Sequence, residues 1–186
     1  MVSLGLDAST TCVGYAFTED KKILDMGFID IKKEKTPKDK VEKVLDFLHE
    51  SPYIDTVTDI NIEDNLSGFA GGRTSQQVII KLAKFNAILC FMLENFDYKV
   101  HSINPMTARK NVFGVARVKG IKAKDLVKMK IEEMYNTSKW CKETKTGLWD
   151  KRNIDMYDGL VMSLFEKKAW LFPKLFVYCL KCINTN

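Results

Sequence analysis

The chain has 186 residues, 46% of them hydrophobic and 28% charged, and a formal net charge of +5 at pH 7. This length suits one well-buried core and is short for two full α/β domains, because domains run to about 100–200 residues each. The composition is typical of a soluble globular chain and excludes a disordered one. We therefore expect a single domain over residues 1–186.

No membrane segment or signal peptide is expected. The longest apolar stretch begins at Trp170 and is interrupted by Pro173, Lys174 and Lys181, so it cannot supply the roughly 20 apolar residues of a membrane helix. Asp7 lies where the apolar core of a signal peptide would begin. These features predict a cytoplasmic protein with reduced cysteines, and the C-x-x-C of the tail lacks the further ligands of a zinc site.

The first 31 residues predict three strands. Residues 2–7 (VSLGLD), 12–18 (CVGYAFT) and 23–31 (ILDMGFIDI) are short runs rich in β-forming residues. Small or charged turn residues separate them. We therefore expect a meander of two antiparallel hairpins.

Helices and strands then alternate. After Pro37, an amphipathic helix is predicted by apolar residues at helical spacing. These residues are Val41, Val44, Leu45 and Leu48. The stretch DTVTDINIEDN predicts a fourth strand that ends at Glu63, and a glycine-bearing loop leads to an apolar helix that Thr74 or Ser75 would cap.

The order of the remaining elements predicts the fold class. In chain order they are a fifth strand over 98–103, a short helix from Pro105, a helix over 123–135, an irregular insertion at about 136–152, a helix from Ile154 to about 168 and an apolar extension from about 169. A meander followed by strands joined through helices makes an α/β fold with one five-stranded mixed sheet flanked by helices. This is the order of an RNase H-like fold.

Four carboxylates have positions that indicate a metal site. In this order the first and fourth strands are parallel neighbours, so Asp7 and Glu63 would end side by side. Asp155 and Asp158 lie three residues apart at a helix start, which puts both on one helical face. Clustered carboxylates repel one another, and a hard cation such as Mg²⁺ or Mn²⁺ is the usual partner. Taken alone, the aspartate pair would equally suit a helix start, where the macrodipole favours negative charge.

The stretch LGLDASTTCVGYAF around Asp7 leaves a second interpretation open. Actin- and hexokinase-like ATPases use a similar strand and turn to hold a nucleotide phosphate. Such enzymes need two domains of this kind and a second phosphate loop, in a chain well over twice this length. We therefore keep an ATPase fragment only as a remote alternative.

One segment of the chain is strongly basic. Between Asn104 and Lys130 there are eight basic residues and one acidic residue, so the rest of the chain is slightly acidic. The basic residues are Arg109, Lys110, Arg117, Lys119, Lys122, Lys124, Lys128 and Lys130. A local concentration of this kind indicates a polyanionic partner, most simply nucleic acid, although a solvated helical face would have the same composition.

These motifs together resemble the RuvC-type Holliday junction resolvases, and most of all their phage and viral members. The matching stretches are LGLDASTTCVGYAF, INIED, LSGFAGGRTS with LAKFNAIL, INPMTARKNVFG, KAKDLVKMKIEEM and NIDMYDGLVMS. Together they touch most of residues 1–167. Their order and spacing, rather than any single motif, make the resemblance specific.

The resemblance implies a magnesium-dependent endonuclease. The implied ligands of two Mg²⁺ ions, which Mn²⁺ would replace, are Asp7, Glu63, Asp155 and Asp158. The residues expected to contact DNA are Lys110, Lys124, Arg109, Arg117, Lys119, Lys122, Phe69 and Arg73. A two-fold homodimer would nick opposite strands of a branched, four-way DNA junction without a nucleotide cofactor, in the host cytoplasm if the protein is phage or viral.

Some features leave alternatives open. Bacterial members carry an aromatic wedge close after the glutamate, and here Phe69 is the nearest aromatic residue. Other branched DNA, RNA–DNA hybrid or RNA would be cut by the same chemistry, so the carboxylates do not discriminate among these substrates. Trp140 and Trp149 of the insertion would either stack on bases or form a local core.

Overall fold

The computed structural model describes residues 1–64 and 76–166. The strands are β1 (Val2–Ala8), β2 (Cys12–Glu19), β3 (Lys22–Asp30), β4 (Val57–Glu63) and β5 (Lys99–Ile103). The helices are α1 (Pro37–His49), α2 (Gln76–Asn95), α3 (Pro105–Phe113), α4 (Ala123–Met134) and α5 (Asn153–Ser163), with a 3₁₀ turn at Ile54–Thr56. Phe69, Arg73, the caps expected at Thr74 or Ser75, and the apolar extension lie outside the described residues.

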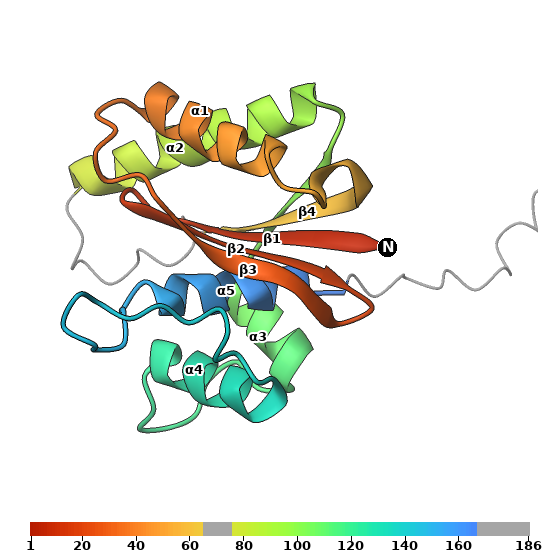
Figure 1. Cartoon of the computed structure of the whole chain (residues 1–186), viewed down its shortest axis with the longest axis vertical. Coiled ribbons are helices and arrows are strands. Elements are labelled where there is room, and N and C mark those ends of the chain that lie inside the picture. The colour runs from red at the N-terminus through yellow and green to blue at the C-terminus, as the bar shows by residue number, and fades with distance from the viewer. Residues whose placement is uncertain (65–75, 167–186) are drawn as a thin grey trace, which may run out of the picture.

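The predicted fold class is confirmed. The sheet has the strand order β3-β2-β1-β4-β5, in which the first three strands are antiparallel neighbours and β1, β4 and β5 are parallel. Helices α1 and α2 cover one face of the sheet, and α3, α4 and α5 lie on the other (Figure 1). The parallel strands β1 and β4 therefore end at the same edge, with Asp7 and Glu63 as their last or next-to-last residues.

Local sequence signals account for the helix starts. Thr36 caps α1, because its hydroxyl accepts from the Asp39 amide at 3.1 Å while the Asp39 carboxylate accepts from the Thr36 amide. Asn104 caps α3 by accepting from the amides of Met106 and Thr107, and a proline follows each of these caps. The helices predicted after Pro37 and from Pro105 are thus confirmed.

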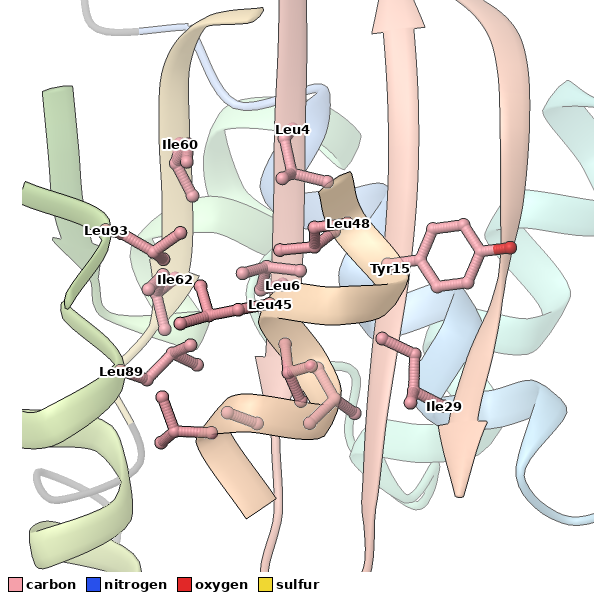
Figure 2. Packing of buried hydrophobic residues seen from close by; sticks show 14 of the residues in the cluster. Leu4, Leu6, Tyr15, Ile29, Leu45, Leu48, Ile60, Ile62, Leu89 and Leu93 are labelled. Carbon is pink, nitrogen blue, oxygen red and sulfur yellow. The ribbon is translucent and has the colours of Figure 1, made fainter. Parts of the chain in front are cut away.

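Side chains fill the face of the sheet that α1 and α2 cover. Leu4 and Leu6 of β1, Ile60 and Ile62 of β4, and residues of both helices form one buried cluster (Figure 2). Leu45 and Leu48 supply the α1 side of this cluster, and Leu89 and Leu93 supply the α2 side. Because alternate residues of a strand point to opposite faces, Gly5 and Asp7 of β1 point to the other side of the sheet.

Helix α5 packs on this other face backbone against backbone. A Cβ atom added to Gly5 would overlap the Gly159 carbonyl, and one added to Gly14 would overlap the Asp155 carbonyl. Gly14 is the cross-strand partner of Asp7. Two glycines on the sheet therefore let α5 lie close to it at both ends of the helix, with Gly14 beside the first turn and Gly5 beside the last turns.

Helix α5 ends earlier than predicted. Its last residue is Ser163 rather than about residue 168. Side chains from the sheet bind its terminal carbonyl groups: Asn61 donates to the Met162 carbonyl at 3.0 Å, and Thr18 donates to the Ser163 carbonyl at 3.3 Å. These hydrogen bonds satisfy carbonyl groups of the last turn of α5. The apolar periodicity of the sequence does not indicate that the helix ends at this residue.

The insertion is held against the start of α5. The Lys142 amide donates to the Asn153 side chain at 3.0 Å, and the Asn153 amide group donates back to the Lys142 carbonyl at 2.8 Å. Trp149 packs against Tyr157 of α5 with ring centroids 6.3 Å apart. For Trp149 this contact favours the local core over base stacking.

Among the described helices, α2 is long and apolar enough by length and composition to cross a membrane. Core helices of soluble proteins pass the same test. Leu82, Phe85, Leu89 and Leu93 of α2 are buried in the core, so we interpret α2 as a core helix. Its outer face nevertheless exposes apolar residues.

Candidate functional site

Three of the four predicted carboxylates meet at one edge of the sheet. Asp7 from β1, Glu63 from β4 and Asp158 from α5 each offer an oxygen atom, and these atoms lie within 4.8 Å of one another. We call these three residues the carboxylate cluster. Asp7 is 8% exposed and Asp158 4% exposed, so the charges lie in a largely buried position.

Strand pairing and the packing of α5 together position the three carboxylates. β1 and β4 are parallel neighbours in register, with Leu6 opposite Ile62, so Asp7 and Glu63 follow at the same level. The glycine contacts described above bring α5 close to the end of β1. Asp158 lies one turn into α5, which places it over the two strand ends.

Burial and mutual repulsion disfavour the charged state of the cluster. Burial, followed by the neighbouring Glu63 carboxylate, raises the pKa of Asp7 well above its ordinary value. Burial and the Asp158 carboxylate raise the pKa of Glu63 to about 8. Burial likewise raises the pKa of Asp158 to about 6, although Arg109 and Lys124 act in the opposite direction. A cation bound among these oxygens would remove this cost.

The donor set fits a hard divalent cation. The three groups are carboxylates, which are the oxygen ligands that Mg²⁺ and Mn²⁺ take in proteins. Oε2 of Glu63 is buried and has no hydrogen-bond partner among the described residues. A buried carboxylate oxygen without a partner is costly, and a bound cation would supply the missing contact.

Two basic residues border the cluster. Lys124 at the start of α4 binds Asp155 at 3.1 Å, and Nη2 of Arg109 on α3 lies 3.8 Å from Oδ1 of Asp158. Asp155 is not one of the three clustered groups, since its carboxylate lies one turn earlier on α5 beside Lys124. Burial alone would lower the pKa of Lys124, but the carboxylates of Asp155 and Asp158 raise it overall.

Of the predicted DNA-contacting residues that the structure describes, Arg109 pairs with Asp158 of the cluster and Lys124 pairs with the adjacent Asp155, whereas the others pair with none of these carboxylates. Lys110 is exposed at the end of α3, and Lys119 and Lys122 are exposed in the loop before α4. Arg117 in the same loop lies 3.2 Å from the Met106 sulfur. The side chain of Arg109 is only 12% exposed, so Arg109 is the more buried neighbour of the cluster.

Cys12 is a neighbour of the cluster that the sequence did not single out. Burial raises the pKa of its thiol to about 12, and the nearby Asp155 carboxylate acts in the same direction. Its position on β2, two residues from Gly14, is the signal that would have placed it beside α5. A protonated, buried thiol is a packing residue rather than a nucleophile.

No protein-family model and no curated protein matches the sequence. Thermus thermophilus RuvC matches the structure with a TM-score of 0.59 and 12% identity, over 88% of this chain and 91% of that one. The structure of T. thermophilus RuvC in complex with Holliday junction substrate matches with a TM-score of 0.57 and 12% identity, over 88% and 90%. The yeast mitochondrial Holliday junction resolvase Ydc2 matches with a TM-score of 0.57 and 18% identity, over 87% of this chain and 75% of that one.

The resemblance seen in the sequence motifs is thus confirmed in three dimensions, at the level of the fold. The likeness to phage and viral members is not confirmed by these structures. With its mixed five-stranded sheet and flanking helices, this chain has the RNase H-like fold of RuvC and Ydc2.

Proposed function

We propose that this chain is a magnesium-dependent endonuclease that resolves four-way DNA junctions by paired nicking. One observation carries the proposal: a buried carboxylate cluster lies at the strand ends of a RuvC-like sheet, with Arg109 and Lys124 beside it. Carboxylates that bind a cation next to lysine and arginine suit a substrate with a phosphate backbone.

Asp7, Glu63 and Asp158 would hold the first ion, and Asp155 would join them for a second. Bound Mg²⁺ would supply activation of water and charge stabilisation of the leaving oxygen during phosphodiester hydrolysis. The chain itself contributes the burial that keeps bulk water away from the cluster. Lys124 and Arg109 neutralise part of the acidic charge and would orient the phosphate group.

The basic segment would hold the DNA on the α3–α4 side of the sheet. Lys110, Arg117, Lys119 and Lys122 are exposed there and available for phosphate contacts. The structure of RuvC with its Holliday junction substrate supports a branched-DNA partner for the proposal. Phe69 and Arg73 stay proposed contacts outside the described residues.

The outer face of α2 supports a homodimer. Ile80 is 53% exposed and Phe91 62% exposed, and Ala87 between them is exposed as well. These positions recur at helical spacing and form an apolar stripe on the helix, which the exposed Lys84 interrupts. A second copy of α2 would cover the stripe, and the resulting two-fold dimer would present two carboxylate clusters to a junction that has the same symmetry.

The direct test is cleavage of labelled four-way junction, linear duplex, branched fork and RNA–DNA hybrid, each in Mg²⁺ and in EDTA. We expect paired nicks in the junction that require Mg²⁺ and leave ligatable ends. Preference for the hybrid or the fork would reassign the substrate within the same chemistry. ATP hydrolysis without nicking would overturn the proposal in favour of the ATPase alternative. The cytoplasmic location, in the host if the protein is phage or viral, stays a prediction.

A further inference from the structure

A second group of basic residues lies on the opposite side of the sheet from the basic segment. A cavity of about 300 Å³ opens between the loop after β1, the segment before α1 and the first turns of α2. Its lining includes Lys35, Lys40 and Lys81, together with Thr10, Glu34 and Phe85. We call it the lysine pocket.

Lys40 is fixed in the wall of the lysine pocket. Its ammonium group donates to the Thr10 carbonyl and, at 3.2 Å, to the Ile31 carbonyl. These bonds take two of its three N–H donors, which leaves one donor for a ligand. Burial, and secondarily the charge of Lys81, lowers the pKa of Lys40, whereas Glu34 acts against this change.

The charges of the lysine pocket are not balanced among the described residues. Glu34 is the one carboxylate in its lining; its Oε1 pairs with Lys43 at 2.7 Å, and its Oε2 is buried without a hydrogen-bond partner among the described residues. The lysine pocket is therefore lined by three lysines, Lys35, Lys40 and Lys81, and by one carboxylate. This carboxylate also binds a fourth lysine, Lys43. Three cations around one concave site attract an anion, and lysine is a common partner for phosphate.

The position of the lysine pocket relates it to the carboxylate cluster. Thr10 lies three residues after Asp7 along the chain, so their Cα atoms are at most about 11 Å apart. Helices α1 and α2, which contribute to the lysine pocket, cover one face of the sheet, whereas α3 and α4, which carry Arg109 and Lys124, lie on the other (Figure 1). One DNA strand that crosses the cluster would thus meet basic groups on both sides, a few nucleotides apart at about 3.4 Å of rise each.

From this arrangement we propose that the lysine pocket binds a backbone phosphate of the DNA strand that is being cut, a few nucleotides from the cleaved bond. The inference rests on the proposed function, because it assigns a further contact to the same substrate. Arg109 and Lys124 would hold the strand on one side of the cluster and the lysine pocket would hold it on the other. Contacts on both sides fix the scissile phosphate along the strand direction.

The test measures the salt dependence of junction binding in an Asp7→Asn background, in which DNA is bound without being cut. Lys81→Gln and the double change Lys35→Gln with Lys81→Gln should lower the slope of log Kd against log salt by about 0.9 per lost phosphate contact. Lys40 is left intact because it ties the Thr10 loop to Ile31.

Lys38→Gln is the matched control. Lys38 lies on α1 two residues before Lys40, its side chain is 77% exposed and it pairs with Glu42, outside the lysine pocket. Its slope should equal that of the parent. Far-ultraviolet circular dichroism and native mass of every variant verify the fold and the oligomeric state.

The possible outcomes separate the two proposals. If the native chain cuts junctions but both lysine-pocket variants keep the parent slope, the lysine pocket is wrong and the proposed function stands. If the native chain cuts no DNA but the slope falls as expected, the phosphate site stands and the endonuclease proposal falls. Saturable binding of inorganic phosphate that Lys81→Gln abolishes, with an unchanged slope, would assign the lysine pocket to a free anion and overturn the DNA assignment.

Discussion

Asp7 lies where β1, β4 and α5 meet. It ends the apolar run of β1, faces Gly14 across the hairpin and lies within the carboxylate cluster. Asp7→Asn should abolish Mg²⁺-dependent nicking, a loss of at least about 10³-fold, because an amide is a poor ligand for a hard cation. Junction binding in EDTA should stay within about twofold or become tighter, since one buried negative charge is removed. Gel shift and cleavage assays on the same preparation check both results.

Asp59→Asn is the matched control for this change. Asp59 lies on β4 opposite Ser3, points to the same face of the sheet as Glu63 and hydrogen-bonds His101 at 2.9 Å rather than joining the cluster. Its cleavage rate should equal that of the native chain. Equal rates for Asp7→Asn and the native chain would remove Asp7 from the metal site.

Arg109 should set the acidic limit of the proposed cleavage activity. Its guanidinium lowers the pKa values of Asp158 and Glu63, which burial otherwise raises. Arg109→Gln should therefore raise both pKa values and move the acid limb of the cleavage profile to higher pH, whereas Arg109→Lys should restore most of the native profile. Cleavage rates between pH 5 and 9 at saturating Mg²⁺ test this prediction. If the rate of Arg109→Gln is lower at every pH but its acid limb stays at the native pH, Arg109 acts only as a DNA contact.

At the scale of elements, the position of α5 determines the geometry of the site. Gly14→Ala would place a methyl group on the Asp155 carbonyl, so α5 must move away from the sheet. We expect a loss of about 3 kcal/mol in the free energy of unfolding and a weaker Mg²⁺ affinity, because Asp158 moves away from Asp7 and Glu63. Urea unfolding in EDTA and calorimetric titration with Mg²⁺ measure the two effects.

Gly27→Ala provides the comparison for Gly14→Ala. The atoms nearest to a Cβ atom at Gly27 would be the ring and hydroxyl of Tyr15, which belong to a side chain and can shift. This variant should lose less stability and keep its Mg²⁺ affinity. Loss of affinity in both variants would mean that general destabilisation, rather than the position of α5, explains the result.

Much of the fold was predictable from local signals. Hydrophobic alternation and turn residues marked the strands, while Pro37 and Pro105 marked two helix starts. The end of α5 was not predictable, because the Asn61 and Thr18 side chains that bind its last carbonyl groups come from strands far away in sequence. Local patterns carry no information about such tertiary partners.

The candidate site was predictable in part. Asp7 and Glu63 were placed together because strand order fixes which strand ends are neighbours, and Asp158 was added to them from its position at a helix start and from the family resemblance. The ion pairs of Arg109 and Lys124 depend on how α3 and α4 pack on α5, which no spacing in the sequence specifies. The lysine pocket was missed for the same reason, because its lysines come from around the start of α1 and from α2, which are far apart in sequence.

At the scale of the whole molecule, stability without metal should fall as the pH rises. The folded pKa values are raised, to about 8 for Glu63 from 4.5 and to about 6 for Asp158 from 3.8. The folded state therefore binds more protons than the unfolded chain in this range, and the stability present below about pH 4 is lost as the pH rises toward 8. In EDTA we expect the Tm to fall on the order of 5–10 °C between pH 5 and pH 8.

Saturating Mg²⁺ should remove this fall, because binding to the folded state alone stabilises it. The Asp7→Asn variant should be the more stable protein in EDTA at pH 8 and should respond little to Mg²⁺. Differential scanning calorimetry over this pH range measures both effects. A native Tm that is independent of pH and of Mg²⁺ would contradict a metal site at the cluster.

The apolar stripe on α2 predicts the oligomeric state. Phe91→Ser replaces an apolar side chain that is 62% exposed with a polar one. It should convert a dimer to a monomer and reduce paired nicking to single nicks. Val118→Ser, at an exposed position in the loop before α4, is the control and should stay dimeric. Sedimentation equilibrium measures the mass, and a native chain that is monomeric at high concentration would refute the dimer.

The two faces of the sheet also differ in how they respond to sequence divergence. On the α1–α2 face, side chains of varied size fill the space, so volume-conserving exchanges are absorbed there. At Gly5 and Gly14 main chain touches main chain, so exchanges at neighbouring positions leave that distance unchanged as long as both glycines are kept. The interior on one face can therefore drift over many generations while the carboxylates on the other face keep their spacing.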